Sequence, residues 1–316
     1  NAAKVRNRGF EIELDADIIR KKDLTLSVGI NGTHYRTTLL SVPADQIPNY
    51  DETMDLPKGC WTVATEDMAQ AGTASHAGRG IFYLRGEGKD LFNLYMPKYA
   101  GVDEKSGLPL YWHRVTYYDV NMNETTGVYE HGGRYANYKV GDNVKTDVAA
   151  DASYYEVGSA TPDWIGGLTL SLKWKDFDFS VVSAYQIGGK FFSMEYSQHL
   201  FRGSSMGRQR IPVSKDLVGN TWNPDNTSAY YPMQWFPSSG ASSFYLDGSL
   251  LPGSHNYTDM SLFDATYFRL KNITLGYTLP KKLTKKINIS GLRVFASADN
   301  LLLFSAEKGI DPTLSI

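Results

Sequence analysis

Ser205 lies in the one stretch whose spacing suits nucleophilic catalysis. Gly203–Gly207 reads G-x-S-x-G, and Asp225 or Asp247 followed by His255 keeps the chain order of a hydrolase triad. That motif needs a buried strand before the serine and a helix after it, whereas Arg, Gly and Ser precede Ser205 and a proline-containing segment follows. We therefore interpret the stretch as a flexible Gly/Ser loop and expect that the protein is not an enzyme.

A second stretch has the spacing of a calcium-binding loop. Oxygen-bearing side chains alternate along it and an acidic residue stands twelfth, as in an EF-hand. The candidate ligands are Asp119, Asn121, Asn123 and Glu130. Glu124 stands sixth, where the sharp turn needs glycine, and no flanking helices are indicated. An Asx-rich solvated turn is the alternative, so calcium is the one candidate cofactor and no other is expected.

Aromatic side chains gather between Gly188 and Leu262, among Asn, Asp and Ser residues. Aromatic rings stack on the C–H surfaces of sugars and anchor protein interfaces, whereas amides and carboxylates pair with hydroxyl groups. Packing of the loop against itself is the alternative. The candidates for contact with a ligand or partner are Trp222, Tyr230, Tyr231, Trp235 and Phe236.

Composition excludes several classes of protein. The chain has 316 residues, of which 42% are hydrophobic, so it can bury a sizeable core. Its 32 basic and 34 acidic residues give a formal charge of −2 with no long basic run, which excludes nucleic acid as a partner. Cys60 is the single cysteine, and the six histidines are scattered without ligand spacing, so they predict no metal site. Neither a signal peptide nor an apolar stretch of transmembrane-helix length is found.

The elements that must position these residues are β-strands, because the strongest periodicity is two. Apolar and polar residues alternate from Phe10 to Ile18 and, after a short turn, from Leu24 to Ile30. A second hairpin runs from Trp164 to Ile187 with its turn at Lys175–Asp176. The polar face of the first strand carries the acidic row Glu11, Glu13, Asp15 and Asp17. Four acids at this spacing repel each other in a dry core, so we expect the row to line water.

Connections between strands alternate between tight turns and the long stretches Thr37–Arg79 and Gly188–Leu262. This alternation is typical of outer-membrane β-barrels, whose strands cross the bilayer with about 9 to 11 residues. A soluble β-sandwich that binds carbohydrate is the alternative, because its apolar faces would meet in a core. Shorter strands are predicted at Gly80–Gly86, Leu91–Ala100, Leu108–Tyr118, Gly127–Tyr138 and Leu292–Phe304. No long helix is predicted.

Phe263–Pro312 resembles the C-terminal signature of the SusC/RagA family of TonB-dependent outer-membrane transporters. It contains Arg269-Leu270-Lys271-Asn272, then Leu-Gly-Tyr-Thr-Leu-Pro, an Arg-Val-Phe strand, Asn300-Leu301 and Lys308-Gly-Ile-Asp-Pro. Tyr99–Trp112 and Gly158–Val181 are also similar to the family. This resemblance implies an all-β fold, an antiparallel transmembrane β-barrel of 22 strands with short periplasmic turns and long extracellular loops. Residues 1–316 would supply about ten strands, the C-terminal portion, without the plug domain or signal peptide.

The same resemblance implies a function and a location. The function is TonB-dependent import of oligosaccharides or peptides across the outer membrane of a Gram-negative bacterium. The implied partners are a SusD-like surface lipoprotein, the TonB complex acting through the plug region, the lipid bilayer, and a glycan or peptide substrate. The soluble carbohydrate-binding β-sandwich and, behind it, a serine hydrolase remain as alternatives.

Overall fold

The computed structural model describes residues 3–43, 56–64, 81–201, 214–233, 245–246, 249–250 and 258–313. The chain divides into two compact units. The first, here called the sheet unit, comprises Val5–Thr38, Ser159–Phe191 and Phe263–Ile316. The second, the loop unit, comprises Asn1–Lys4, Leu39–Gly158 and Phe192–Leu262.

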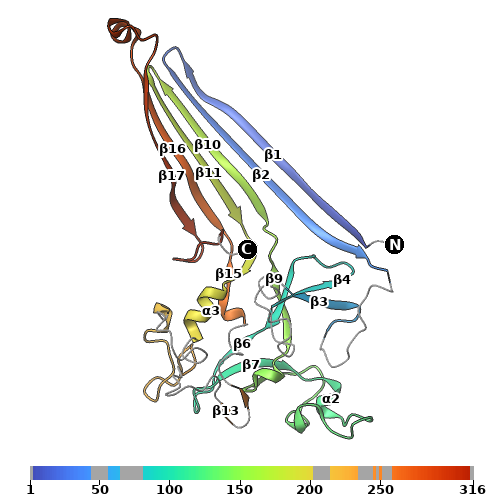
Figure 1. The fold of residues 1–316 in the computed structure, drawn as a ribbon. Helices are drawn as coiled ribbons and strands as arrows, with labels where there is room; N and C mark the ends of the chain where they lie inside the picture. Colours follow the sequence, from blue (N-terminus) through green and yellow to red (C-terminus); the bar gives the residue numbers. More distant parts are fainter. Residues whose placement is uncertain are drawn as a thin grey trace. The chain divides into compact units, whose positions relative to one another are not determined.

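Six long strands form one sheet in the sheet unit, in the order β1-β2-β10-β11-β16-β17 (Figure 1). The strands are β1 (Lys4–Lys21), β2 (Leu24–Ser41), β10 (Trp164–Trp174), β11 (Phe177–Ile187), β16 (Tyr267–Thr278) and β17 (Arg293–Ser305). They contain between 11 and 18 residues. The two predicted hairpins are confirmed.

Local sequence explains the hairpin of β10 and β11. Its turn has two residues, and Lys175 adopts a left-handed conformation with φ of 52°. A positive φ in a two-residue turn matches the right-handed twist of the flanking strands, so the strands pair without splaying. Pairing starts at Trp174 and Phe177 and continues in register to Trp164 and Ile187.

The alternation in each strand becomes two distinct faces of the sheet, because directly opposed residues of antiparallel strands share a face. One row across five strands is apolar: Leu26, Leu172, Phe179, Leu275 and Ala296. The adjacent row is polar: Ser27, Ser171, Ser180, Thr274 and Ser297. The register therefore keeps an apolar and a polar face in phase over these strands.

A β-bulge interrupts the pairing of β16 with β17. Leu270 opposes Leu302 and Asn272 opposes Asp299, so β17 carries one extra residue at this point. Asn300 has φ of 50° there, a left-handed conformation that Asn tolerates better than most residues. The bulge gives a conformational reason for the Asn300 of the family-like segment.

The order of strands leaves β1 and β17 at the two edges of the sheet, and no closed barrel is formed within the described residues. The expectation of about ten barrel strands is too high for this part of the chain: six long strands share the sheet. The other strands are short and belong to separate small sheets. The sequence pattern did not distinguish these two kinds of strand, because it reports alternation and not length or pairing.

The loop unit is built from short strands and turns. One sheet has the order β3-β4-β5-β9, with β3 (Cys60–Ala64), β4 (Phe82–Gly86), β5 (Asn93–Pro97) and β9 (Tyr154–Ser159). A second has β6 (Tyr99–Val102), β7 (Pro109–Arg114) and β8 (Asn143–Thr146). Two further pairs are β13 (Tyr245–Leu246) with β14 (Ser249–Leu250), and β12 (Lys190–Phe192) with β15 (Leu262–Asp264), whose residues belong mostly to the sheet unit.

Helical segments are short. They are α2 (Tyr117–Val120), α3 (Met194–Phe201), α4 (Lys281–Thr284), η3 (Glu130–Gly133), η4 (Ala149–Asp151), η5 (Lys215–Leu217), η7 (Asp259–Ser261) and η8 (Lys285–Ile287). In the described part of the chain, no helix has the length and apolar character needed to cross a membrane.

One predicted strand is wrong. Gly127–Tyr138 is a series of turns around η3, and within it His131, Gly132 and Gly133 all have positive φ. That backbone is not extended, because three successive residues of positive φ depart from the strand conformation. The apolar alternation that suggested the strand comes from Val128 and Tyr138, which are both exposed.

The hydrophobic core lies in the loop unit. One cluster joins Cys60, Leu84 and Tyr95, and another joins Leu200, Leu217 and Tyr231. Among the described residues of the sheet unit, Ala265 is the only buried hydrophobic residue. The loop unit therefore has a hydrophobic core of its own, whereas the sheet unit has two faces that it does not cover itself.

Candidate functional site

The apolar face of the sheet is not covered within the sheet unit. Leu14 of β1 is 62% exposed, Leu275 of β16 is 52% exposed and Phe177 of β11 is 44% exposed. Burial of one such side chain is worth about 1.5 to 3 kcal/mol, and soluble monomers seldom expose large contiguous apolar patches. A face of this kind needs an apolar medium or a partner to cover it.

The opposite face is polar and hydrogen-bonded across strands. Ser27 donates to Asp17 Oδ1 at 2.7 Å, and Asn272 donates to Ser297 and Asp299 at 2.9 and 2.7 Å. Arg293 of β17 forms an ion pair with Asp178 of β11. The side chains on this face therefore satisfy one another in the presence of water.

The acidic row lies on this polar side of β1. All four residues, Glu11, Glu13, Asp15 and Asp17, are exposed. Asp17 also lies 3.7 Å from Arg20. An exposed position suits the expectation that the row lines water, and its contact with a ligand or with a plug domain stays a prediction.

The five candidate aromatics are separated by the structure. Trp222 is half-buried: its Nε1 donates to the Glu104 carbonyl at 3.1 Å, and its ring lies against Gly107, whose φ of 73° belongs to the turn before β7. Trp235 and Phe236 lie outside the described residues. These contacts fix the position of Trp222 and leave part of its ring accessible.

The two adjacent tyrosines have opposite environments. Tyr231 is 9% exposed and packs in the core with Leu200 and Leu217, so in this structure it serves packing and presents no surface. Tyr230 is 57% exposed, and its ring lies edge-on to those of Tyr99 and Tyr231. The hydroxyl of Tyr99 donates to the Tyr230 carbonyl at 2.7 Å and holds this backbone in place. A binding role for Tyr230 and Trp222 stays a prediction.

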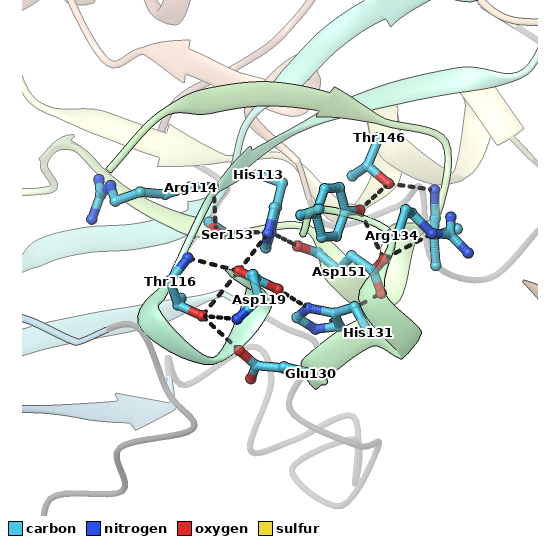
Figure 2. Close-up of polar contacts among 12 residues, drawn as sticks. His113, Arg114, Thr116, Asp119, Glu130, His131, Arg134, Thr146, Asp151 and Ser153 are labelled. Atoms are coloured by element: carbon cyan, nitrogen blue, oxygen red, sulfur yellow. Dashed lines mark hydrogen bonds and ion pairs between the residues drawn. The ribbon is translucent and has the colours of Figure 1, made fainter. Parts of the chain in front are cut away.

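A polar cluster forms where β7, α2 and η3 meet in the loop unit (Figure 2). Buried and half-buried residues alternate along β7, and His113 is on the buried face with Tyr111. Thr116 then starts α2 with a capping box, in which its hydroxyl accepts from the Asp119 amide and the Asp119 carboxylate accepts from the Thr116 amide. The box turns the Asp119 side chain back toward His113.

Asp119 joins two histidines. His113 Nε2 lies 3.0 Å from Asp119 Oδ2, and His131 Nδ1 lies 2.7 Å from Asp119 Oδ1. Figure 2 shows the three side chains pointing toward one another. His113 and Asp119 are almost fully buried, whereas His131 is partly exposed. We call these three residues the His–Asp cluster.

Hydrogen bonds shape the acid–base properties of this cluster. Burial by itself would raise the pKa of Asp119, but hydrogen bonds from His113, His131 and Thr116 hold that pKa well below its ordinary value. Burial would lower the pKa of His131, yet its bond to Asp119 and the charges of Asp151 and Glu130 raise that pKa above its ordinary value. The cluster therefore keeps Asp119 ionised.

Tyr135 and Asp151 support the cluster from one side. The Tyr135 hydroxyl donates to Asp151 Oδ2 at 2.8 Å, and its ring stacks on His113 at a centroid distance of 4.0 Å. Burial raises the pKa of Tyr135, and the Asp151 carboxylate raises it further. Tyr135 therefore stays protonated and acts as a donor.

The four residues of the calcium hypothesis have different surroundings. Asp119 and Glu130 both contact the Thr116 hydroxyl. Asn121 is only partly exposed and donates to the Tyr117 carbonyl, whereas Asn123 accepts from the amides of Thr125 and Thr126 in an Asx turn. These four side chains thus make separate local bonds, in which Asp119, Asn123 and Glu130 use oxygen atoms and Asn121 uses its Nδ2.

Sequence reasoning missed the two histidines, which it dismissed as scattered. His113, Asp119 and His131 are separated by 5 and 11 residues, a spacing that matches no metal or catalytic motif. The only sequence signal was the position of His113 in β7, where it falls on the same side of the alternating strand as the buried Tyr111. The serine motif around Ser205, together with Asp247 and His255, lies outside the described residues, and Asp225 is exposed in a turn.

The sequence is similar to those of known TonB-dependent receptors. The chain is 23% identical over 313 residues to TonB-dependent receptor P3 of Formosa agariphila, covering 99% of this chain and 25% of that receptor. It is 25% identical over 318 residues to TonB-dependent receptor SusC of Bacteroides thetaiotaomicron, covering 99% of this chain and 24% of SusC. No family model matches the sequence. The chain thus spans about a quarter of the relatives it matches.

Solved structures agree on the fold. The structure of the RagAB peptide transporter matches with a TM-score of 0.63 at 23% identity, covering 99% of this chain and 27% of the matched chain. The "closed-closed" state of the RagAB peptide importer matches with a TM-score of 0.62 at 22% identity. The described fold, mostly β with few helices, therefore corresponds to part of a TonB-dependent receptor.

Sheet, strand order and relatives define the class: the chain matches part of a TonB-dependent receptor, and receptors of this class lie in the outer membrane of Gram-negative bacteria. Within that class the chain is of the SusC/RagA type, and it aligns with about a quarter of such a receptor.

Proposed function

We propose that this chain forms part of the wall of a transmembrane β-barrel that imports a nutrient in a TonB-dependent manner. The observation that carries the proposal is the uncovered apolar face, which runs in register across the sheet and contrasts with a polar opposite face. Strands of 11 residues or more suffice to cross a bilayer, which takes about 9 to 11 tilted residues. Lipid supplies the covering that the apolar side chains need.

Topology supports an orientation. β2 ends and β10 begins at the same end of the sheet at which β11 ends and β16 begins, because the four strands are successive antiparallel neighbours. The long connections 42–163 and 188–266 leave from that end, whereas two two-residue turns and the 14-residue connection 279–292 close the other. Outer-membrane barrels place short turns in the periplasm and long loops outside the cell. We therefore place the start of both long connections at the extracellular side.

The polar face then lines a water-filled lumen. The acidic row on β1 and the serine and threonine row offer carboxylates and hydroxyl groups to a passing solute. A lumen-facing position also accounts for the absence of repulsive cost, because water and mobile ions screen the four acids. This arrangement supports transport of a polar cargo.

We infer that the cargo is an oligosaccharide or a peptide, captured together with a SusD-like surface lipoprotein. Support comes from the similarity to SusC, a TonB-dependent receptor, and to the RagAB peptide transporter. Trp222 and Tyr230 supply exposed ring surface for such a contact. Energy would come from the TonB complex through the plug domain of the whole receptor.

The soluble β-sandwich is disfavoured by the same observation. Two sheets of a sandwich pack their apolar faces together about 10 Å apart and bury those side chains. Among the described residues of the sheet unit, no second sheet lies on the apolar face, and Leu14 and Leu275 stay more than half exposed. A β-sandwich would need a second layer over the apolar face, and the described residues of the sheet unit do not supply one.

Uptake by whole cells tests the proposal. Cells that express the full-length receptor are given fluorescent peptide or oligosaccharide mixtures, with and without functional TonB, and intracellular label is measured. We expect receptor-dependent accumulation of one mixture that is abolished without TonB, and co-purification of a surface lipoprotein with the receptor. Equal accumulation with and without the receptor, at matched outer-membrane levels, would refute import.

A further inference from the structure

The geometry points to a binding site for a divalent transition-metal ion of the zinc class at His113, Asp119 and His131. One ligand atom from each residue lies within 4.8 Å of the other two. The residues come from β7, α2 and η3, so the ion would tie together three elements of the loop unit. This inference does not rest on the proposed transport function.

The second nitrogen of His113 is held by a hydrogen bond as in known metal sites, and that of His131 lies near a carboxylate. His113 Nδ1 lies 2.6 Å from the Asp151 carbonyl oxygen, which only accepts, so Nδ1 carries a proton and, in the neutral ring, the lone pair of Nε2 points at Asp119. His131 Nε2 lies 3.9 Å from Asp151 Oδ1 on the side away from Asp119. Metal-binding histidines almost always give their other N–H to a carbonyl or carboxylate, which fixes the ring and its tautomer.

Without an ion, the contact between Asp119 and a neutral His113 lacks a proton. A neutral imidazole has one N–H, and the Asp151 carbonyl takes it, so Nε2 and the Asp119 carboxylate face each other as two acceptors. Thr116 does not resolve this, because its amide and hydroxyl donate to Asp119 Oδ2 and supply no proton to His113 Nε2. Both acceptors are buried, which makes an unresolved contact costly.

Charge leads to the same conclusion. Asp119, Glu130 and Asp151 carry three negative charges, and Arg134 supplies one positive charge through its 3.8 Å contact with Asp151. Asp147 faces the outer side of Arg134 and is exposed to water. Metal binding requires both imidazoles to be neutral, and in that state the cluster has a net charge of −2, which one divalent cation neutralises.

The backbone at His131 is consistent with a dedicated position. His131 has φ of 52° and ψ of 27°, a left-handed conformation that is uncommon for a residue with a side chain. It is followed by Gly132 and Gly133, both with positive φ. This turn directs the imidazole to Asp119, and such conformations gather at functional sites.

Donor chemistry selects the ion. Two imidazoles and one carboxylate suit Zn²⁺ and similar transition metals, whereas Ca²⁺ takes six to eight oxygen ligands. Three protein ligands leave a fourth position, and the partial exposure of His131 gives it access to solvent. We therefore assign zinc-class ions to this cluster and not the calcium of the EF-hand-like spacing.

Zinc binding to the full-length receptor in detergent tests the inference. Receptor freed of metal with a chelator is dialysed against Zn²⁺ alone, and bound zinc is counted by mass spectrometry. We expect wild type and the control His199→Gln to hold about one zinc ion more than His131→Gln. His199 lies in α3, outside the cluster. His131→Cys, which offers another zinc ligand, should restore binding, and Co²⁺ in place of zinc should give the visible absorption of a tetrahedral site.

The variants separate metal binding from packing. Loss of an outer-shell partner alone costs about 10- to 100-fold in metal affinity, so removal of the His131 ligand should weaken zinc binding by at least about 100-fold. His131 is partly exposed, so its replacement is expected to leave the fold intact, which limited proteolysis will show. Equal zinc content in wild type and His131→Gln would overturn the inference and leave the cluster as a set of hydrogen-bonded, protonated imidazoles.

Discussion

Arginine at position 170 tests whether the apolar face meets lipid. Leu170 is opposed by Val28 of β2 and Val181 of β11, so its side chain lies within the apolar face. Ser171, the next residue, is opposed by Ser27 and Ser180 and lies on the polar face. Leu170→Arg and Ser171→Arg therefore place the same charge at almost the same depth on opposite faces.

The expected free-energy cost of Leu170→Arg follows from the depth of residue 170 in the bilayer. β10 has 11 residues, and Leu170 is the seventh, one residue past the middle of the strand. One residue is a rise of about 3.4 Å along the strand, or about 2.5 Å along the membrane normal at a tilt of about 40°. That places Leu170 near the midplane of an apolar band about 25 Å tall, where Arg costs about 2 to 4 kcal/mol. The folding equilibrium should shift by about 30- to 1,000-fold.

Urea titration of the full-length receptor in phospholipid vesicles measures this cost. The fraction folded is read from Trp fluorescence and from the heat-sensitive mobility of the folded barrel in gels. We expect Leu170→Arg to lower the free energy of unfolding by about 2 to 4 kcal/mol and Ser171→Arg to change it by less than about 1 kcal/mol. Equal losses for both variants, or a larger loss for Ser171→Arg, would refute the lipid-facing assignment.

Three further predictions concern the loop unit. Tyr231→Ala should destabilise it by about 3 kcal/mol because a buried ring is lost, whereas Tyr230→Ala should leave its protease resistance unchanged and weaken lipoprotein co-purification; the reverse pattern would contradict the burial assignment. Gly107→Ala should destabilise it, since a Cβ there would lie 2.5 Å from the Trp222 ring at a residue with φ of 73°; unchanged thermal unfolding of the variant would contradict this. Burial would raise the pKa of Glu156, but hydrogen bonds from Lys89 and Asn93 lower it below 4.5; the pair's stabilisation is therefore present above pH 4.5 and lost as pH falls through the lowered pKa. Glu156→Gln should destabilise the unit slightly at neutral pH and flatten its acid unfolding curve, and a gap that widens in acid would argue against the pair.

Local patterns predicted the long hairpins because the information is contained in neighbouring residues. From Trp164 to Ile187 the alternation, the two-residue turn and the register all follow from residues next to one another. The pairing of β2 with β10 joins Leu26 to Leu172, residues far apart in the chain. Alternation predicts that such strands exist but cannot say which strand is the neighbour.

The candidate site was less accessible to sequence reasoning. Tyr230 and Tyr231 are adjacent and of one type, and only the contacts of Tyr231 with Leu200 and Leu217 decide which ring is buried. The His–Asp cluster depends on turns with positive φ around His131, which no period in the sequence encodes. These placements are tertiary, so propensity and spacing could not supply them.

Spin labels along β10 test the central claim, that one face of the sheet meets lipid and the other meets water. Positions 168 to 172 are replaced by Cys one at a time in the full-length receptor, with Cys60→Ser and any other reactive thiol removed, and labelled in vesicles. Collision rates with oxygen, which concentrates in lipid, and with a polar nickel chelate are measured by electron paramagnetic resonance. We predict that labels at positions 168, 170 and 172 are accessible to oxygen and those at 169 and 171 to nickel, with a period of two residues and opposite phase. Protection of the labels at positions 168, 170 and 172 from both reagents, as in a packed protein core, would contradict the account.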